Sequence, residues 1–179
     1  GEGHTDWQPA HLRQVLTEEI AFLWHFATTA DAAYLRQLRD VRVPMRDGVE
    51  LSANVWLPHS ESSFPAVLLR TPYGNDAADF ERLGLRAYAE AGYAVVFMSV
   101  RGRGRSHGEF GFFFVEGPDG YDTVEWVAAQ SWCNGKVAMD GGSYLGTAQW
   151  LAARERPPHL VCMLPAVPAG DWFNEIPYM

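Results

Sequence analysis

The feature that most restricts the fold of this chain is a nearly unbroken apolar run at Tyr93–Val100. The run is far shorter than the roughly 20 residues that a membrane-spanning helix needs. Its length and composition are typical of a β-strand that is covered on both faces, and such strands occur in parallel sheets packed between helices. The run therefore predicts an α/β protein built around a central sheet.

Segments with strand and helix periodicity alternate around this run. Taken in chain order, they predict a strand, a helix ended by a left-handed cap at Gly92, the central strand, a second helix, a third strand, a third helix and a last strand. The corresponding segments are Pro65–Arg70, Phe80–Ala91, Tyr93–Val100, Tyr121–Ala128, Lys136–Asp140, Tyr144–Arg154 and Leu160–Pro165. Strands that alternate with helices in this order favour a mostly parallel sheet.

The residues before that alternation have a different pattern. Val41–Met45 and Val49–Leu57 alternate between apolar and polar residues and flank an Arg-Asp-Gly turn, which predicts an antiparallel hairpin. Pro44 places its strand at a sheet edge, because proline cannot donate a ladder hydrogen bond. Further upstream, apolar residues recur at helical spacing. The predicted organisation is a helical segment at residues 1–39 and the sheet domain at residues 40–179.

Composition argues against several classes of partner. The formal net charge of the 179 residues is −8, whereas nucleic-acid binding requires clustered Lys and Arg. No apolar run is long enough to span a membrane. The two cysteines lack metal-site spacing and are too few for a disulfide scaffold. We therefore expect no nucleic acid, membrane, metal or organic cofactor, and, with no recognisable signal peptide, a cytoplasmic location.

The stretch Val137–Gly146 contains the main candidate for a catalytic residue. A strand runs into Gly-Gly-Ser, ending at Ser143, and then directly into an amphipathic helix. This arrangement is typical of a nucleophile elbow, a sharp turn that exposes the serine hydroxyl above the sheet. The generic motif has glycine two residues after the serine, where this chain has Leu145 and places Gly146 one residue later. The alternative interpretation is an ordinary turn with Ser143 as the helix N-cap.

The elbow Gly-Gly-Ser-Tyr-Leu-Gly resembles that of the cocaine esterase-like and X-prolyl dipeptidyl-peptidase hydrolases, a family that includes α-amino acid ester hydrolases and glutaryl cephalosporin acylases. Other segments match the pattern of this family in the same order, namely Val43–Leu51, Arg70–Gly74, Arg101–Phe110 and Asp119–Trp126. The resemblance implies the α/β-hydrolase fold and a serine hydrolase that cleaves an ester, amide or peptide substrate.

The same resemblance implies three catalytic positions. Ser143 corresponds to the nucleophile, and the Tyr73 hydroxyl and the Tyr144 backbone N–H correspond to the two donors of the oxyanion hole. Preorganised donors of this kind stabilise the tetrahedral intermediate of acyl transfer. Without the resemblance, Tyr73 would more often be a loop aromatic packed on the core.

The loop Arg101–Glu109 contains other residues with possible roles. Gly102 and Gly104 are similar to a dinucleotide-binding fingerprint, but His107 occupies the position of its third glycine, which argues against a nucleotide site. We expect the glycines to make turns and His107 to be structural or solvated. The loop arginines are expected to pair with carboxylates such as Asp119, Asp122 or Glu125.

The acid and base of a triad are missing from the expected order. In α/β-hydrolases the nucleophile is followed by an Asp or Glu and then by a His. After Ser143 this chain has His159 and then Asp171, in the reverse order, and neither Asp171 nor Asp140 is assigned a catalytic role. We therefore expect a fold that is incomplete at its C-terminus, without the helical cap and β-sandwich domain of the family.

A second fragment would then carry the catalytic Asp and His. Two alternatives remain open: an acyltransferase on the same fold, and a non-catalytic fragment that lacks the acid and base.

Overall fold

The computed structural model describes residues 35–60 and 62–168. The chain separates into two units, residues 1–33 and 34–179, and the described residues belong to the second unit. The helical segment predicted for the start of the chain therefore lies, up to residue 34, outside the described residues.

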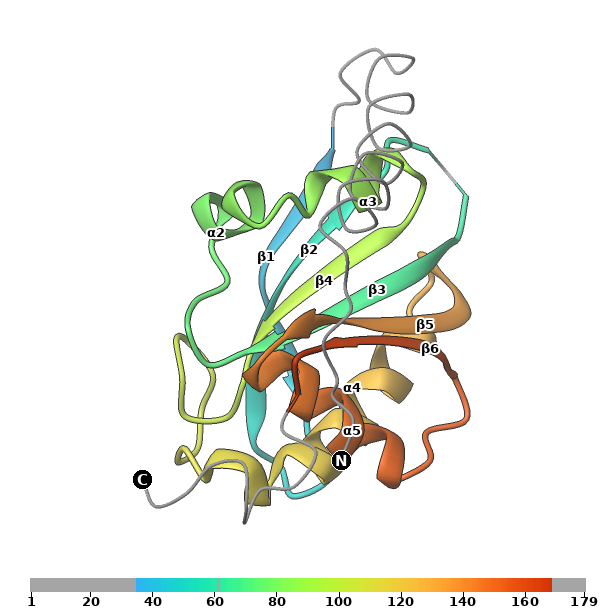
Figure 1. Cartoon of the computed structure of the whole chain (residues 1–179). Coiled ribbons are helices and arrows are strands. Elements are labelled where there is room, and N and C mark those ends of the chain that lie inside the picture. The colour runs from blue at the N-terminus through green and yellow to red at the C-terminus, as the bar shows by residue number, and fades with distance from the viewer. Residues whose placement is uncertain (1–34, 61, 169–179) are drawn as a thin grey trace, which may run out of the picture. The chain divides into compact units, whose positions relative to one another are not determined.

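The second unit is built on a six-stranded sheet with the strand order β1-β2-β4-β3-β5-β6 (Figure 1). In chain order its elements are β1 (Arg36–Pro44), β2 (Glu50–Leu57), β3 (Phe64–Thr71), α2 (Ala77–Arg82), α3 (Arg86–Glu90), β4 (Ala94–Ser99), the short 3-10 helix η1 (Phe112–Phe114), α4 (Glu116–Ala128), β5 (Cys133–Gly142), α5 (Tyr144–Arg154) and β6 (Leu160–Ala166). Strands β4, β3, β5 and β6 are parallel to one another, as the alternation of strands and helices predicted.

The N-terminal hairpin is formed by β1 and β2, which pair in antiparallel fashion. Strand β1 lies at the sheet edge, as Pro44 predicted. One prediction is wrong at its boundary: the helical segment was expected to continue to residue 39, but Arg36 already pairs with Leu57 and belongs to β1. Pairing with a distant strand decided the state of these residues, which a local helical period cannot anticipate.

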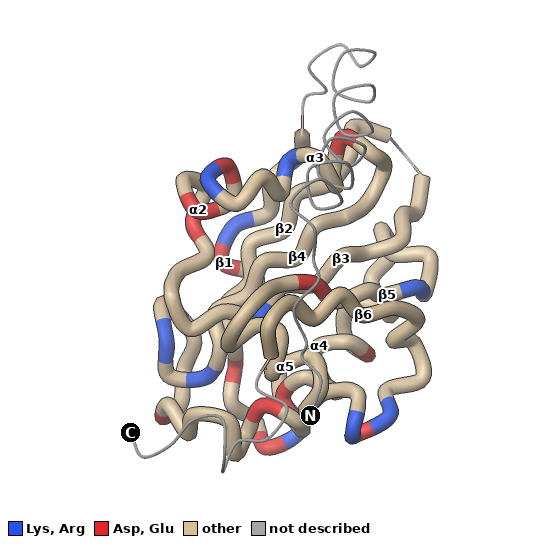
Figure 2. The backbone as a smooth tube through the Cα atoms, in the orientation of Figure 1, with Lys and Arg blue, Asp and Glu red and all other residues tan. Residues whose placement is uncertain are grey.

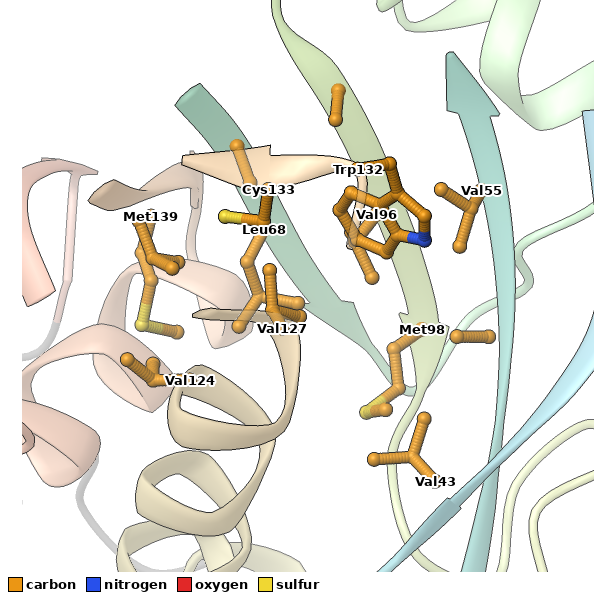
Figure 3. Packing of buried hydrophobic residues seen from close by; sticks show 14 of the residues in the cluster. Val43, Val55, Leu68, Val96, Met98, Val124, Val127, Trp132, Cys133 and Met139 are labelled. Carbon is orange, nitrogen blue, oxygen red and sulfur yellow. The ribbon is translucent and has the colours of Figure 1, made fainter. Parts of the chain in front are cut away.

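The sheet buries side chains on both faces. Strand β4 is buried along its whole length, which confirms the prediction from the apolar run. Its alternate residues point to opposite sides: Val96 and Met98 join one hydrophobic cluster, and Val95 and Phe97 join another. Helices α4 and α5 contribute to the first cluster, where the Val124 side chain of α4 packs toward the strands (Figure 3). Helices α2 and α3 contribute to the second.

The helix predicted between Phe80 and Ala91 is divided into α2 and α3. Gly84 lies between them with a φ of +69°, a left-handed conformation that interrupts the helical hydrogen-bond ladder. Phe80 and Ala89 from the two helices still bury their side chains in the same cluster. Apolar spacing alone predicted one continuous helix, because both halves present the same face to the sheet.

Charged residues of both signs are spread among one another along the described backbone (Figure 2). Cys133 is buried, Cys162 is exposed, and both are free thiols. In the described part of the chain, no helix is both long and apolar enough to cross a membrane.

Candidate active site

Ser143 lies at the junction of β5 and α5, at the carboxyl edge of the parallel strands (Figure 1). Its backbone has φ 56° and ψ −119°, a strained conformation for a residue with a side chain. The residue is exposed, and its backbone N–H donates to the carbonyl of Ala166 at 2.9 Å. Its side chain makes no capping hydrogen bond to α5. The geometry is therefore that of the predicted elbow, and the serine hydroxyl is not engaged as a helix cap.

Close packing explains two of the three glycines of the elbow, Gly141 and Gly146. A Cβ atom on Gly141 would lie 2.5 Å from the Cβ atom of Leu145, and Gly141 also has a φ of +132°. A Cβ atom on Gly146 would lie 3.0 Å from the carbonyl oxygen of Ala166. Leu145 is buried in the core, so the position that is glycine in the generic motif contributes here to packing.

Tyr73 lies in the loop after β3, beside the elbow. Its ring meets that of Tyr144 edge to face, with 6.4 Å between the ring centroids. The loop is anchored because the Tyr73 N–H donates to Thr71 Oγ1 at 3.1 Å and the Asn75 amide donates to the carbonyl of Phe97 at 3.0 Å. Tyr73 is 72% exposed, and no residue in the described ranges hydrogen-bonds its hydroxyl. The structure thus brings the three sequence-predicted site residues together.

The side chain of Tyr144 points into the protein. Its hydroxyl donates to Glu116 Oε1 at 3.0 Å, and Glu116 forms a buried ion pair of 2.7 Å with Arg70. Burial, followed by the neighbouring carboxylate, raises the pKa of Tyr144, so its hydroxyl remains a donor. Burial also raises the pKa of Glu116, while Arg70 opposes that shift.

Sequence reasoning did not identify the Arg70–Glu116 pair. The available signal was an arginine at the end of an apolar strand, since a cation at such a position requires a buried carboxylate.

Two further side chains hold the elbow from other directions. Asp140 accepts from the Tyr88 hydroxyl at 2.8 Å and from the Gly141 N–H at 2.7 Å, so both of its oxygens have structural partners. The fully buried amide of Gln149 donates to the carbonyl of Gly141 at 3.1 Å and accepts from the N–H of Leu164 at 3.0 Å. These bonds tie the elbow to α5 and to β6.

The described histidines that the sequence singled out have partners away from Ser143. His159 pairs with Glu125 at 2.8 Å. It directly precedes β6, whose far end lies at the carboxyl edge of the sheet. Since a strand rises about 3.3 Å per residue, His159 lies roughly 20 Å from that edge. His107 lies 4.0 Å from Glu50, the first residue of β2. Strand β2 is three strand spacings from β5, or roughly 14 Å. Asp171 lies outside the described residues.

The arginine loop has a structural role in this fold. Arg101 pairs with Asp119 at 2.6 Å, one of the predicted partners, and with Asp47 at 2.7 Å. The other two suggested carboxylates have different partners: Asp122 pairs with Arg46, and Glu125 with His159. Among the residues that the structure describes, no cluster of His, Cys, Asp and Glu has the makings of a metal site.

Tyr73 lines two pockets at this edge of the sheet. One, of about 510 Å³, also includes Gly142, the residue before Ser143. Its apolar wall consists of Leu69, Leu83, Leu85 and Leu145. The other, of about 620 Å³, is lined by the loop after β3, by the start of α2, and by polar residues from elsewhere that include Arg39 and Arg105.

The strand order, the antiparallel hairpin and the serine at a strained strand-to-helix turn define an α/β-hydrolase. The family model for X-Pro dipeptidyl-peptidase (S15 family) matches residues 47–179, and the chain belongs to this family. The chain is 36% identical over 138 residues to the cocaine esterase of Rhodococcus sp. (strain MB1 Bresler), covering 75% of this chain and 24% of that protein.

Solved structures agree with this assignment. A CocE/NonD family hydrolase from Staphylococcus aureus superposes with a TM-score of 0.65 at 31% identity, over 72% of this chain and 27% of that one. An α-amino acid ester hydrolase gives a TM-score of 0.70 at 30% identity, over 80% of this chain and 27% of that one. The chain therefore spans about a quarter of the length of these relatives.

Proposed function

We propose that this chain carries the nucleophile and the oxyanion hole of a serine hydrolase that acts on an ester or an amide. The observation that carries the proposal is the exposed Ser143 in its strained backbone conformation between β5 and α5. Strain of this kind persists where the surrounding structure over-determines it, and it clusters at active sites. The names of the relatives support the substrate class, since they include an esterase, an amino acid ester hydrolase and an X-Pro dipeptidyl-peptidase.

In the proposed reaction, Ser143 Oγ attacks the carbonyl carbon of the substrate while a base removes its proton. The carbonyl π electrons move onto oxygen, and the resulting oxyanion accepts hydrogen bonds from the Tyr144 N–H and the Tyr73 hydroxyl. Collapse of this intermediate expels the alcohol or amine, which takes the proton from the base. Water then attacks the acyl-serine by the same route and releases the acid.

The base and its carboxylate are proposed to come from a segment outside residues 1–179. The positions of His107 and His159, each paired with a carboxylate away from Ser143, support this part of the proposal. In the assembled enzyme, a histidine from that segment should lie about 2.6–3.2 Å from Ser143 Oγ. The leucine-walled pocket beside Gly142 is suited to an apolar group of the substrate.

Labelling of the complete protein with a fluorophosphonate tests the proposal, because the probe requires an activated serine and uses the oxyanion donors. We expect covalent labelling of the wild type and loss of both labelling and aryl ester turnover in Ser143→Ala. The isolated 179-residue chain should label far more slowly, since it lacks the proposed base. Rapid labelling of that chain would show that the base lies within these 179 residues, contrary to the proposal.

Substitution of Tyr73 tests the oxyanion hole. Tyr73→Phe removes the exposed hydroxyl and keeps the ring against Tyr144, so kcat should fall by roughly 10²–10³ with a smaller change in KM. An unchanged kcat would remove Tyr73 from the oxyanion hole.

The absence of a triad histidine from the described surroundings of Ser143 favours one second candidate, a fragment that kept the elbow without catalysis. A complete protein that carries an accessible Ser143 but resists labelling would support that candidate.

A further inference from the structure

The ion pair between Arg70 and Glu116 is the most deeply buried charged feature of the described structure. The two side chains are 0% and 1% exposed, and Arg70 Nη1 lies 2.7 Å from Glu116 Oε2. The same Nη1 donates to the backbone carbonyl of Glu116 at 2.9 Å. Arg70 therefore holds both the carboxylate and the backbone of one residue, at the first position of α4. Burial of two charges is expensive, so such a pair calls for an explanation beyond stability.

The second carboxylate oxygen of Glu116 contacts the elbow. Glu116 Oε1 accepts the hydrogen bond of the Tyr144 hydroxyl at 3.0 Å. Tyr144 is the first residue of α5 and directly follows Ser143. The ring of Phe113 stacks on the ring of Tyr144 at a centroid distance of 4.3 Å. This stacking restricts the orientation of the Tyr144 ring, with its hydroxyl at the Glu116 carboxylate. A fixed hydroxyl and a packed ring leave little freedom to the backbone of Tyr144.

A glycine at the contact between α4 and α5 leaves space for the Arg70 side chain. A Cβ atom on Gly120 of α4 would lie 2.5 Å from the Cβ atom of Ala152 on α5 and 3.1 Å from Arg70 Nη1. The arginine thus occupies space that only glycine leaves open. The pair is built into the contact between the two helices that precede and follow β5.

We propose that the buried Arg70–Glu116 pair is a positioning device that acts through the Tyr144 hydroxyl to hold the Tyr144 backbone N–H at the oxyanion. This inference rests on the proposed function. A hydrogen-bond donor stabilises a developing oxyanion only when its position is already fixed, because reorganisation during the reaction removes the gain. Arg70 also offsets the negative charge of Glu116, so the anchor does not repel the oxyanion.

Tyr144→Phe in the complete protein tests the device, since it deletes the anchored hydroxyl and keeps both the ring and the backbone N–H. We expect kcat for an aryl ester and the rate of fluorophosphonate labelling to fall about tenfold, less than the 10²–10³ caused by loss of a whole donor. KM should change less than twofold, roughly, because substrate binding in the ground state does not use the oxyanion donor.

Thr123→Val is the matched control. It removes a buried hydroxyl from α4, the helix that carries Glu116, where Thr123 donates to the carbonyl of Asp119 at 2.6 Å. We expect it to lower the melting temperature about as much as Tyr144→Phe while kcat stays roughly within twofold of the wild type. Equal losses of kcat in both variants would overturn the proposal, because they would show a general effect of stability.

Glu116→Gln gives a second, opposite test. The amide keeps a hydrogen bond to the Tyr144 hydroxyl in either orientation, but it leaves the Arg70 cation uncompensated. Its melting temperature should fall more than that of Tyr144→Phe, while kcat measured well below that temperature should fall less. A larger loss of kcat in Glu116→Gln than in Tyr144→Phe would contradict a positioning role. If Glu116→Gln does not fold, the result for Tyr144→Phe alone decides the question.

The two proposals fail in different ways. A wild-type protein that does not label at Ser143 refutes the proposed function. A wild type that labels at Ser143, together with a Tyr144→Phe variant that matches Thr123→Val, refutes only the positioning role.

Discussion

Gly141→Ala tests the packing of the elbow most directly. The substitution places a methyl group 2.5 Å from the Cβ atom of Leu145 and forces a side chain into a φ of +132°. Backbone strain of this kind costs about 1–3 kcal/mol. Overpacking in a tight core adds about 1–3 kcal/mol. We therefore expect the free energy of unfolding to fall by about 2–6 kcal/mol.

A double-mutant cycle separates the two contributions. Leu145→Gly removes the atom that the new methyl group would contact. By itself it should lower the free energy of unfolding by about 3–6 kcal/mol, because it empties a core position and places a glycine in a helix. In the double variant the overlap is relieved while the backbone strain remains, so the two substitutions should be less than additive by about 1–3 kcal/mol.

Urea unfolding of the four proteins, followed by circular dichroism, gives the coupling free energy. Strict additivity would refute the overlap between Gly141 and Leu145 as the reason for glycine. A loss below about 1 kcal/mol in Gly141→Ala would refute the strain argument as well.

Two other predictions concern the interior around Arg70. Arg70→Met leaves the Glu116 carboxylate buried without its cation and should lower the free energy of unfolding by about 3–5 kcal/mol at neutral pH. The pKa of Glu116 is already raised above its ordinary 4.5 by burial, and Arg70 opposes that rise. A raised pKa in the folded state contributes stability below the unfolded pKa that is lost as the pH rises through the folded pKa. The loss caused by Arg70→Met should therefore be larger at about pH 8 than at about pH 5, in urea titrations at both values; a loss independent of pH would contradict the assignment. Gly120→Ala places a methyl group 2.5 Å from the Cβ atom of Ala152 and should lower the melting temperature, with a loss of about 1–3 kcal/mol in calorimetry; an unchanged melting temperature would show that α4 and α5 can separate freely.

Local periodicity was sufficient for most of the elements. Strand β4 (Ala94–Ser99) lies within the run at Tyr93–Val100 and is buried along its whole length, and the helix predicted at Tyr144–Arg154 has those bounds as α5. These predictions succeeded because the alternation of apolar residues directly reflects which faces of an element are buried. The helix split at Gly84 was missed, because one residue in a left-handed conformation leaves the apolar spacing on both sides unchanged.

The elbow could be placed from sequence because its parts are contiguous. Gly141 and Ser143 belong to one turn whose backbone requirements appear directly as residue types. The neighbourhood of Tyr73 also followed, since the carboxyl ends of parallel strands meet at one edge of a sheet. The catalytic roles of these residues remain predictions that the labelling experiment tests.

The sequence by itself thus determined the order of strands and helices and the turn that presents Ser143, because both depend on residues near one another in the chain. Only the tertiary structure decided what holds that turn. Arg70 and Glu116 are 46 residues apart, and Glu116 and Tyr144 are 28 apart. Their pairing depends on how α4 and α5 pack against the sheet. No local pattern records that geometry, because hydrogen bonds and ion pairs form between whichever groups the packing of the fold brings into contact.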